Sequence, residues 1–227
     1  ILEKEIGTPY ARNRGTKEAK GTIILMLDDD CKADKYWVEN MIESHKKYSK
    51  AWVIQGKTFS LPQGKIYSLL ADFNRFIFVR NHEIKKSTSL KRVFYTNLNS
   101  EIKLLACDTN NFSVKASYFK KYKLSFDESF NLGEDIDLGR QIMQKNGSIM
   151  FCPNVKMYHH ERSTLPQVLR QRWHVGRNVA RIAAKWKTIS IRSKIKQSPR
   201  KLILLVLFCK KSNQLIKLPI LLLLFFL

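Results

Sequence analysis

The sequence predicts an α/β fold in which helices alternate with strands. Residues 10–20 are typical of a helix that stops before Gly21, and the apolar run Ile23 to Leu27 follows directly. Residues 35–48 again show helical spacing of apolar side chains, and residues 51–59 (AWVIQGKTF) indicate a second strand. A strand, a helix and a strand in this order favour a partly parallel sheet.

The rest of the chain continues this alternation, with turn-forming residues between the apolar segments. We expect an aromatic-rich helix at 65–82, a long polar loop at 84–103, a turn, strand and helix start at 106–119, a helix within 125–147, two short strands around a proline turn at 149–163, and a basic helix interrupted at Gly176 within 165–187.

Three adjacent carboxylates, Asp28, Asp29 and Asp30, follow the first apolar run and must repel one another. A short β-branched and leucine-rich run with no polar face is typical of a buried strand. Open α/β sheets bind ligands at the carboxyl ends of their strands, where a divalent cation would offset the repulsion. The alternative is an acidic turn in water.

A second group of acids opens the helix predicted within 125–147. Glu134 and Asp135 stand in its first turn, where the helix dipole by itself favours carboxylates, so capping is the alternative to a functional role. We interpret Asp137 as a charge on the helix face. His159 and His160 lie on the later strand, and a single histidine is more often structural than a metal ligand.

Basic charge is concentrated toward the end of the chain. The chain has 41 Lys and Arg against 19 Asp and Glu, which gives a formal net charge of +22. Residues 162–227 hold 15 of these basic residues and no acidic one. A surface of this kind implies an anionic partner, such as nucleic acid, phospholipid headgroups or a phosphorylated substrate.

Two apolar runs near the end favour a membrane among these partners. Residues 202–208 and 218–227 are each shorter than the ~20 residues that span a bilayer. We expect the second run to be a truncated transmembrane helix, with a short interfacial hairpin as the alternative. The basic residues before these runs predict association with anionic lipid and a domain that faces the cytoplasm. The four cysteines contain no Cys-x-x-Cys pair, which fits a reducing compartment.

The chain resembles inverting glycosyltransferases of family 2 from about Pro9 to Trp173. The segments that carry the resemblance are, in order, ARNRGTKEAKG with IILMLDDDCKAD, CDTNNFSVKASYF, FDESFNLGEDIDLGRQ, MYHHERS and RQRW. The resemblance implies a GT-A, Rossmann-like fold with a mixed, mainly parallel sheet flanked by helices. It also implies a nucleoside-diphosphate sugar as donor. The first strand, turn and helix of the family are missing from the sequence.

The resemblance also implies a role for each matching residue. Asp30 and His159 would hold a Mg²⁺ or Mn²⁺ ion against the diphosphate, and Asp135, with Glu134 beside it, would act as the general base. The residues that would bind the nucleotide-sugar are Arg12, Asn13, Arg14, Asp28, Asp29, Asp108 and Asn111. The alternatives are an exposed basic helix start for the first three and turn capping for the last two.

One departure from the family concerns its processive members. They carry Gln-x-x-Arg-Trp, whereas Leu169 stands where Gln is required before Arg172 and Trp173. We therefore expect transfer of a single sugar to a glycan or lipid-linked acceptor in cell-envelope or extracellular glycan synthesis. Arg172 and Trp173 would contact the acceptor or the diphosphate, and core or membrane-interface packing is the alternative for the tryptophan.

These observations divide the chain into three parts. Residues 1–163 would form the glycosyltransferase domain, 164–201 a basic amphipathic helical region, and 202–227 a membrane-associated segment. Two other function classes stay open, namely a catalytically inactive membrane scaffold and a basic nucleic-acid-binding protein. Against the second, the basic residues lie beside apolar runs and no aromatic RNA-binding signature is present, so we expect no nucleic-acid partner.

Overall fold

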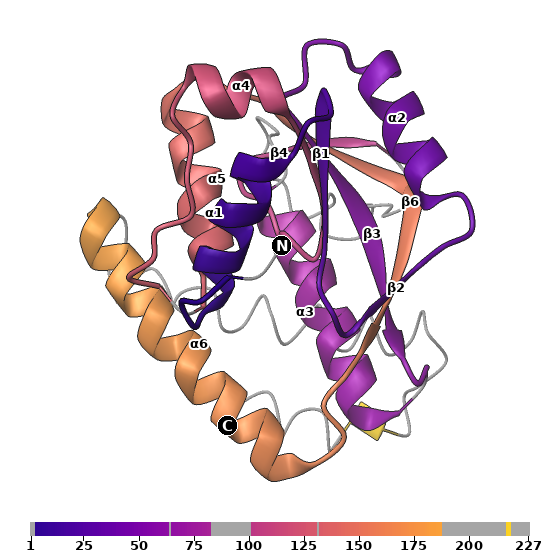
Figure 1. The fold of residues 1–227 in the computed structure, drawn as a ribbon. Coiled ribbons are helices and arrows are strands. Elements are labelled where there is room, and N and C mark those ends of the chain that lie inside the picture. Colours follow the sequence, from indigo (N-terminus) through magenta and orange to yellow (C-terminus); the bar gives the residue numbers. More distant parts are fainter. Residues whose placement is uncertain (1–2, 64, 83–100, 131, 188–216, 219–227) are drawn as a thin grey trace, which may run out of the picture.

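The computed structural model describes residues 3–63, 65–82, 101–130, 132–187 and 217–218. They form a six-stranded sheet with helices on both faces (Figure 1). Within this described part, no helix is long and apolar enough to cross a membrane. The predicted loop at 84–103 and the two apolar runs at 202–208 and 218–227 lie almost entirely outside it.

The elements follow one another much as predicted. The strands are β1 (Ile23–Leu27), β2 (Cys31–Ala33), β3 (Val53–Leu61), β4 (Ile102–Leu104), β5 (Asn111–Lys115) and β6 (Ile149–His160). The helices are α1 (Thr8–Glu18), α2 (Trp37–Lys47), α3 (Ile66–His82), α4 (Ala116–Lys121), α5 (Glu134–Gln144) and α6 (Leu165–Trp186).

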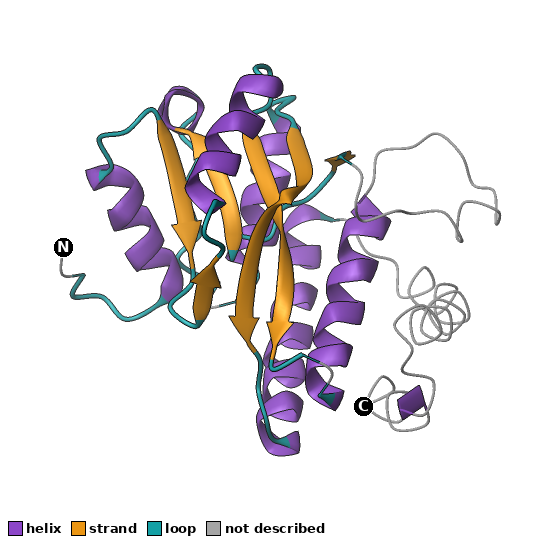
Figure 2. Ribbon diagram, turned by 90° about the vertical axis from the view of Figure 1, so that its right-hand side faces the viewer, coloured by secondary structure: helices purple, strands orange, loops and turns teal. Residues whose placement is uncertain are grey.

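The sheet is mixed, but it is not mainly parallel. Its strand order is β1-β5-β3-β6-β2, and β4 pairs with β6 outside this path. Among the described strands, only β3 and β6 pair in parallel, and the other four pairings are antiparallel. The β1-α2-β3 unit does give two strands of the same direction. The prediction fails because β5 inserts between them, antiparallel to both. Figure 2 shows the strands of the sheet with helices packed against it.

Strand β1 therefore lies at an edge of the sheet instead of in its interior. Ile24 and Met26 are buried, whereas Leu27 is 41% exposed. The prediction of a fully buried strand is wrong because alternate side chains of an edge strand can face outward. The prediction of its position is correct, and Asp28 to Asp30 follow at its carboxyl end.

Two apolar layers hold the helices onto the sheet. On one face, Trp37 and Met41 of α2 pack with Ile54, Cys152 and Val155. On the other face, Leu138 and Ile142 of α5 join a larger cluster around Phe112 and Phe151. In both helices the buried side chains recur every four residues, which is the spacing that places them on one face. Each fully buried side chain of this size contributes about 1.5–3 kcal/mol.

Two predicted interruptions are absent from the described residues. Residues Ile149–His160 form one strand, in which Cys152 pairs with Gly56 and Lys156 with the next residue of β3. The intervening residues bulge out because Pro153 has no N–H to donate to the ladder. Helix α6 runs through Gly176, since packing of Val168 and Ile182 outweighs the cost of about 1 kcal/mol for a helical glycine.

The start of α5 is held against α6 by two contacts. Gly133 has φ +89°, a backbone conformation that favours glycine, and it lies against Cδ1 of Ile182. Asp137 is fully buried, 2.6 Å from Nζ of Lys185, and accepts a hydrogen bond from Nε1 of Trp186 at 2.7 Å. The interpretation of Asp137 as a face charge is wrong, because its carboxylate is fully buried against α6 and pairs with Lys185 of that helix.

Candidate active site

One cavity of about 1210 Å³ opens where β1 ends, beside the starts of α5 and β2. Helices α1, α3 and α6 complete its wall. The sequence-predicted site residues that line it are Arg12, Asp28, Asp29, Asp30, Asp108, Glu134, Asp135, His159 and Arg172. Segments far apart in the chain thus contribute to one site.

Arg12 joins two of the acidic groups on this wall. Its guanidinium lies 2.6 Å from Oδ1 of Asp28 and also forms an ion pair with Glu134. The Arg12 side chain is 12% exposed, and Glu134 is almost completely buried. Burial raises the pKa of Glu134, although Arg12 acts in the opposite direction. The second carboxylate oxygen of Glu134, Oε2, has no hydrogen-bond partner among the described residues.

A histidine between two carboxylates lies at the opposite end of the acidic edge. Nε2 of His159 is 3.3 Å from Oδ1 of Asp30, and Nδ1 is 3.0 Å from Oε1 of Glu161. Glu161 in turn pairs with Arg75 at 2.5 Å. Burial lowers the pKa of His159, but Glu161 more than offsets it, so the pKa lies above its usual value. Oxygen from Asp30 and nitrogen from His159 are donor atoms that suit a divalent cation.

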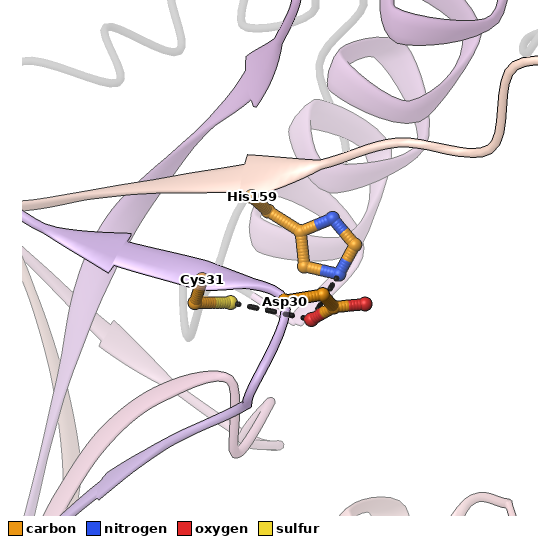
Figure 3. Close-up of side chains that lie close together, drawn as sticks. All are labelled: Asp30, Cys31 and His159. Carbon is orange, nitrogen blue, oxygen red and sulfur yellow. Dashed lines mark hydrogen bonds and ion pairs between the residues drawn. The ribbon is translucent and has the colours of Figure 1, made fainter.

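Cys31 belongs to the same group of side chains (Figure 3). It opens β2 and pairs across the ladder with His159 on β6. Its Sγ lies 3.7 Å from Oδ1 of Asp30, and the donor atoms of Asp30, Cys31 and His159 all lie within 4.8 Å of one another. Burial and the neighbouring Asp30 raise the pKa of the Cys31 thiol to about 12.

Asp135 and Asp108 form a different kind of acidic pair. Both line the cavity, and neither has an ion-pair partner within the part of the chain that the structure describes. Burial, then Asp108 and Glu134, raises the pKa of Asp135 to about 8. One oxygen of Asp135 accepts the N–H of Ile136 at 2.7 Å. A carboxylate with a pKa near neutrality is suited to accept a proton from a bound hydroxyl group.

Comparison with known proteins identifies the family of this chain. Residues 2–119 match the family described as "Glycosyl transferase family 2", and this stretch is more than half of the chain. The chain belongs to glycosyltransferase family 2. The mixed α/β sheet flanked by helices agrees with that assignment.

Two relatives illustrate the similarity. The chain is 25% identical over 175 residues to "Probable N-acetylgalactosaminyltransferase 6" of Caenorhabditis elegans, and the match covers 73% of this chain and 28% of that protein. A solved structure of GalNAc-T7 with UDP, GalNAc and Mn²⁺ is 16% identical, with a TM-score of 0.48, and the match covers 69% of this chain and 31% of that one. This glycosyltransferase chain thus spans about a third of the length of these relatives.

Two residues of the predicted nucleotide site do not line the cavity. The side chain of Asn13 spans the backbone of Phe126, donating to its carbonyl and accepting its N–H, each at 2.9 Å. Arg14 pairs with Glu18 at 3.1 Å on the exposed face of α1. A helix turns by about 100° per residue, so only one of three consecutive side chains, that of Arg12, faces the site.

Asn111 is also placed away from the cavity. It is fully buried at the β-bulge, where Oδ1 accepts Nε1 of Trp37 at 2.8 Å and Nδ2 donates to the carbonyls of Lys57 and Val155. The two residues before it, Thr109 and Asn110, line the cavity in its place. The predicted residue thus lies one position beyond those that line the cavity, because side chains along a strand alternate between its two sides.

Arg172 and Trp173 differ in their access to the cavity. Arg172 is half-buried, lines the cavity and has no ion-pair partner among the residues described here, and burial lowers its pKa. Trp173 is 73% exposed and borders a separate outer groove of about 800 Å³, which Arg172 borders as well. Of this predicted pair, the structure brings only the arginine to the cavity that holds Asp135.

Sequence reasoning missed three residues of the site. Glu161 follows His159 by two positions, so the alternation of a strand could have indicated that both face the same side. Cys31 directly follows the acidic triplet, but one cysteine carries no spacing signal. Arg75 lies in the middle of α3, and no sequence pattern distinguishes it from an ordinary surface arginine.

Proposed function

We propose that this chain transfers one sugar from a nucleoside-diphosphate sugar to a hydroxyl acceptor, with inversion at the anomeric carbon and with a divalent cation. The observation that carries the proposal is the position of Asp135. It shares one cavity with Asp28 to Asp30, and its raised pKa is that of a base rather than of a permanently charged group. A proton acceptor beside a donor site is what a single displacement requires.

Asp30 and His159 fit a divalent cation. Nε2 of His159 lies 3.3 Å from Oδ1 of Asp30, so a cation that takes the place of the proton on Nε2 would have one nitrogen and one oxygen ligand. When bound, Mg²⁺ or Mn²⁺ would neutralise the charge of the departing diphosphate. Asp28, Asp29 and Asp108 would orient the ribose and the donor sugar at the same edge.

Asp135 has the role of general base in this proposal. Its second oxygen would take the proton of the acceptor hydroxyl as that hydroxyl attacks the anomeric carbon. A displacement of this type proceeds in one step and inverts the configuration. Glu134, held by Arg12, would support this base, because its carboxylate helps to raise the pKa of Asp135.

We propose that Arg172 contacts the diphosphate from the wall of the cavity that lies across from the acidic edge. It is a half-buried cation without an anionic partner in the described chain, and it lines the same cavity as the acidic edge. Guanidinium groups bind phosphate oxygens with paired, charge-assisted hydrogen bonds. We assign to Arg172 the positioning of the phosphate groups at the far side from Asp30.

The outer face of α6 supports membrane association. Leu165, Leu169 and Trp173 recur every four residues and are 39%, 38% and 73% exposed, with Arg170 and Arg177 beside them. An apolar stripe with basic flanks fits a bilayer surface that contains anionic lipid. We therefore propose a membrane-proximal glycan or lipid-linked acceptor, a domain that faces the cytoplasm, and a role in cell-envelope or extracellular glycan synthesis.

The test is transfer by the full chain with Mn²⁺ and a panel of nucleotide sugars, with release of nucleoside diphosphate as the readout. Asp135→Asn should lower kcat by about 10²–10⁴. Asp127→Asn, outside the cavity on the segment before α5, is the matched control and should retain activity. Full activity of Asp135→Asn would contradict the assigned base. Retention of configuration in the product, measured by NMR, would contradict single displacement.

A further inference from the structure

The group formed by Asp30, Cys31 and His159 contains a thiol, which a hard cation such as Mg²⁺ does not need as a ligand. Magnesium and manganese ions prefer oxygen ligands, whereas a thiol beside an imidazole is typical of zinc. Sγ of Cys31 and Nε2 of His159 both face the Oδ1 atom of Asp30 (Figure 3). We propose that these three residues form a site selective for thiophilic divalent cations, with Zn²⁺ as the preferred ion.

The distances between the donor atoms agree with tetrahedral coordination. Bonds of ~2.1 Å to nitrogen and oxygen and ~2.3 Å to sulfur place neighbouring N and O ligands about 3.4 Å apart and S and O ligands about 3.6 Å apart. The observed separations are 3.3 Å between His159 and Asp30 and 3.7 Å between Cys31 and Asp30. The third pair of donor atoms, the sulfur and the nitrogen, lies within 4.8 Å.

The surroundings of His159 are those of a zinc ligand. Glu161 lies 3.0 Å from Nδ1 and is itself held by Arg75. A carboxylate in this position fixes the ring so that Nε2 presents its lone pair to the cation. On the opposite side, Cys31 and His159 are direct partners in the antiparallel ladder of β2 and β6, which holds the two ligands at a constant separation.

Binding of the cation replaces one proton. Sγ of Cys31 lies 3.7 Å from Oδ1 of Asp30. Thiolate is the form of cysteine that binds a metal, so the thiol proton would leave to solvent as the S–Zn bond forms. The site then has three protein ligands and one open position, which is the arrangement of zinc sites that take an additional ligand.

One consequence rests on the proposed function. A six-coordinate Mn²⁺ ion on Asp30 and His159 keeps positions for two oxygens of a diphosphate. A four-coordinate Zn²⁺ ion with Cys31 as third ligand keeps only one. We therefore expect Zn²⁺ to inhibit sugar transfer that is supported by Mn²⁺, and to do so through Cys31.

The test begins with binding of Co²⁺ to the full chain, because Co²⁺ replaces Zn²⁺ and its thiolate complexes absorb in the near ultraviolet. One equivalent should produce this absorption, and Zn²⁺ should abolish it where equal Mn²⁺ or Mg²⁺ does not. Cys31→Ser and Cys31→Ala should both lack the band and should bind Zn²⁺ at least ~100-fold more weakly, since even outer partners of ligands contribute 10- to 100-fold. Cys209→Ser is the matched control and should keep the band.

Absence of the band in the wild-type chain, or its persistence in both Cys31 variants, would overturn the site. Circular dichroism of the variants shows whether the fold is retained, and a folded variant without the band supports the proposal. In a separate measurement with Mn²⁺ and donor, Zn²⁺ should inhibit the wild-type chain and spare Cys31→Ser. Equal inhibition of both would overturn the link to transfer. Failure of the proposed function would leave the Co²⁺ band unchanged.

Discussion

Two regions of the cavity wall differ in whether their charged side chains form ion pairs. In the first, Arg12 forms ion pairs with both Asp28 and Glu134, so each of these groups has a partner of opposite charge within the chain. In the second, Asp135 and Asp108 have no cation, and Arg172 across the cavity has no anion in the described residues. Paired groups of this kind support the fold, whereas unpaired groups at a cavity are available to a ligand.

The largest expected effect follows from removal of the paired cation. Arg12→Met would leave two carboxylates, one of them buried, without a partner, and breaking such a pair costs about 3–5 kcal/mol. The free energy of unfolding in urea measures this loss. Arg14→Met, on the same helix with only an exposed partner, should change it by less than about 0.5 kcal/mol. A similar small change in both variants would remove the distinction between the two regions.

The next effect concerns the pH dependence of stability. The pKa of Asp135 is raised to about 8 by burial and its acidic neighbours, so the folded state retains a proton that the unfolded chain loses near its ordinary pKa. Stability should therefore fall as the pH rises between about 4 and 8, by at most about 1.4 kcal/mol per unit. Asp135→Asn cannot ionise and should flatten this slope in urea titrations at several pH values.

Asp127 provides a control, because its pKa is shifted in the opposite direction to that of Asp135. Burial acts to raise its pKa, but Lys185 and Ser129 lower it to about 2. Its contribution to stability is present above the ordinary pKa of aspartate and is lost as the pH falls toward 2. Asp127→Asn should leave the slope between about pH 4 and 8 unchanged. If both variants flatten that slope, Asp135 is not the group that titrates.

A smaller effect is expected for the unpaired arginine. Arg172→Ala should weaken binding of nucleoside diphosphate by roughly 10- to 100-fold, because a hydrogen bond to a charged group contributes about 1.5–3 kcal/mol. The unfolding free energy should be unchanged, since no described anion loses a partner. Calorimetry with UDP and GDP in the presence of Mn²⁺ measures the affinity. Arg177→Ala, which borders only the outer groove, should change it less than twofold.

The smallest effect is expected for Asn13, and it tests whether this residue supports the fold or contacts the nucleotide. Asn13→Ala would remove both hydrogen bonds to the backbone of Phe126 and should cost about 1.5 kcal/mol of stability. Nucleotide affinity, measured in the same calorimetric experiment, should not change. A weaker affinity without loss of stability would restore Asn13 to the nucleotide site that the family resemblance implies.

Local sequence patterns are sufficient for much of the fold. Apolar spacing predicts the approximate positions of α2, β3, α5 and α6, and the family resemblance assigns Asp28 to Asp30 and Asp135 to one site, where the cavity also brings them together. These features depend on residues close together in the chain. The order of the strands cannot be obtained in this way, since β5 pairs with β1 and β3 through contacts between distant segments.

The sequence by itself determined the family of the chain, the acidic triplet after β1 and the acidic start of α5, because each is a local pattern of residue types. Only the tertiary structure decided which side of each element faces the cavity. It directs Arg12 into the cavity and Asn13 to the backbone of Phe126. It places Thr109 and Asn110, and not Asn111, at the cavity, and it brings Arg172 but not Trp173 there. It also brings Cys31 to Asp30 and His159, since ladder pairing joins residues that are far apart in the chain.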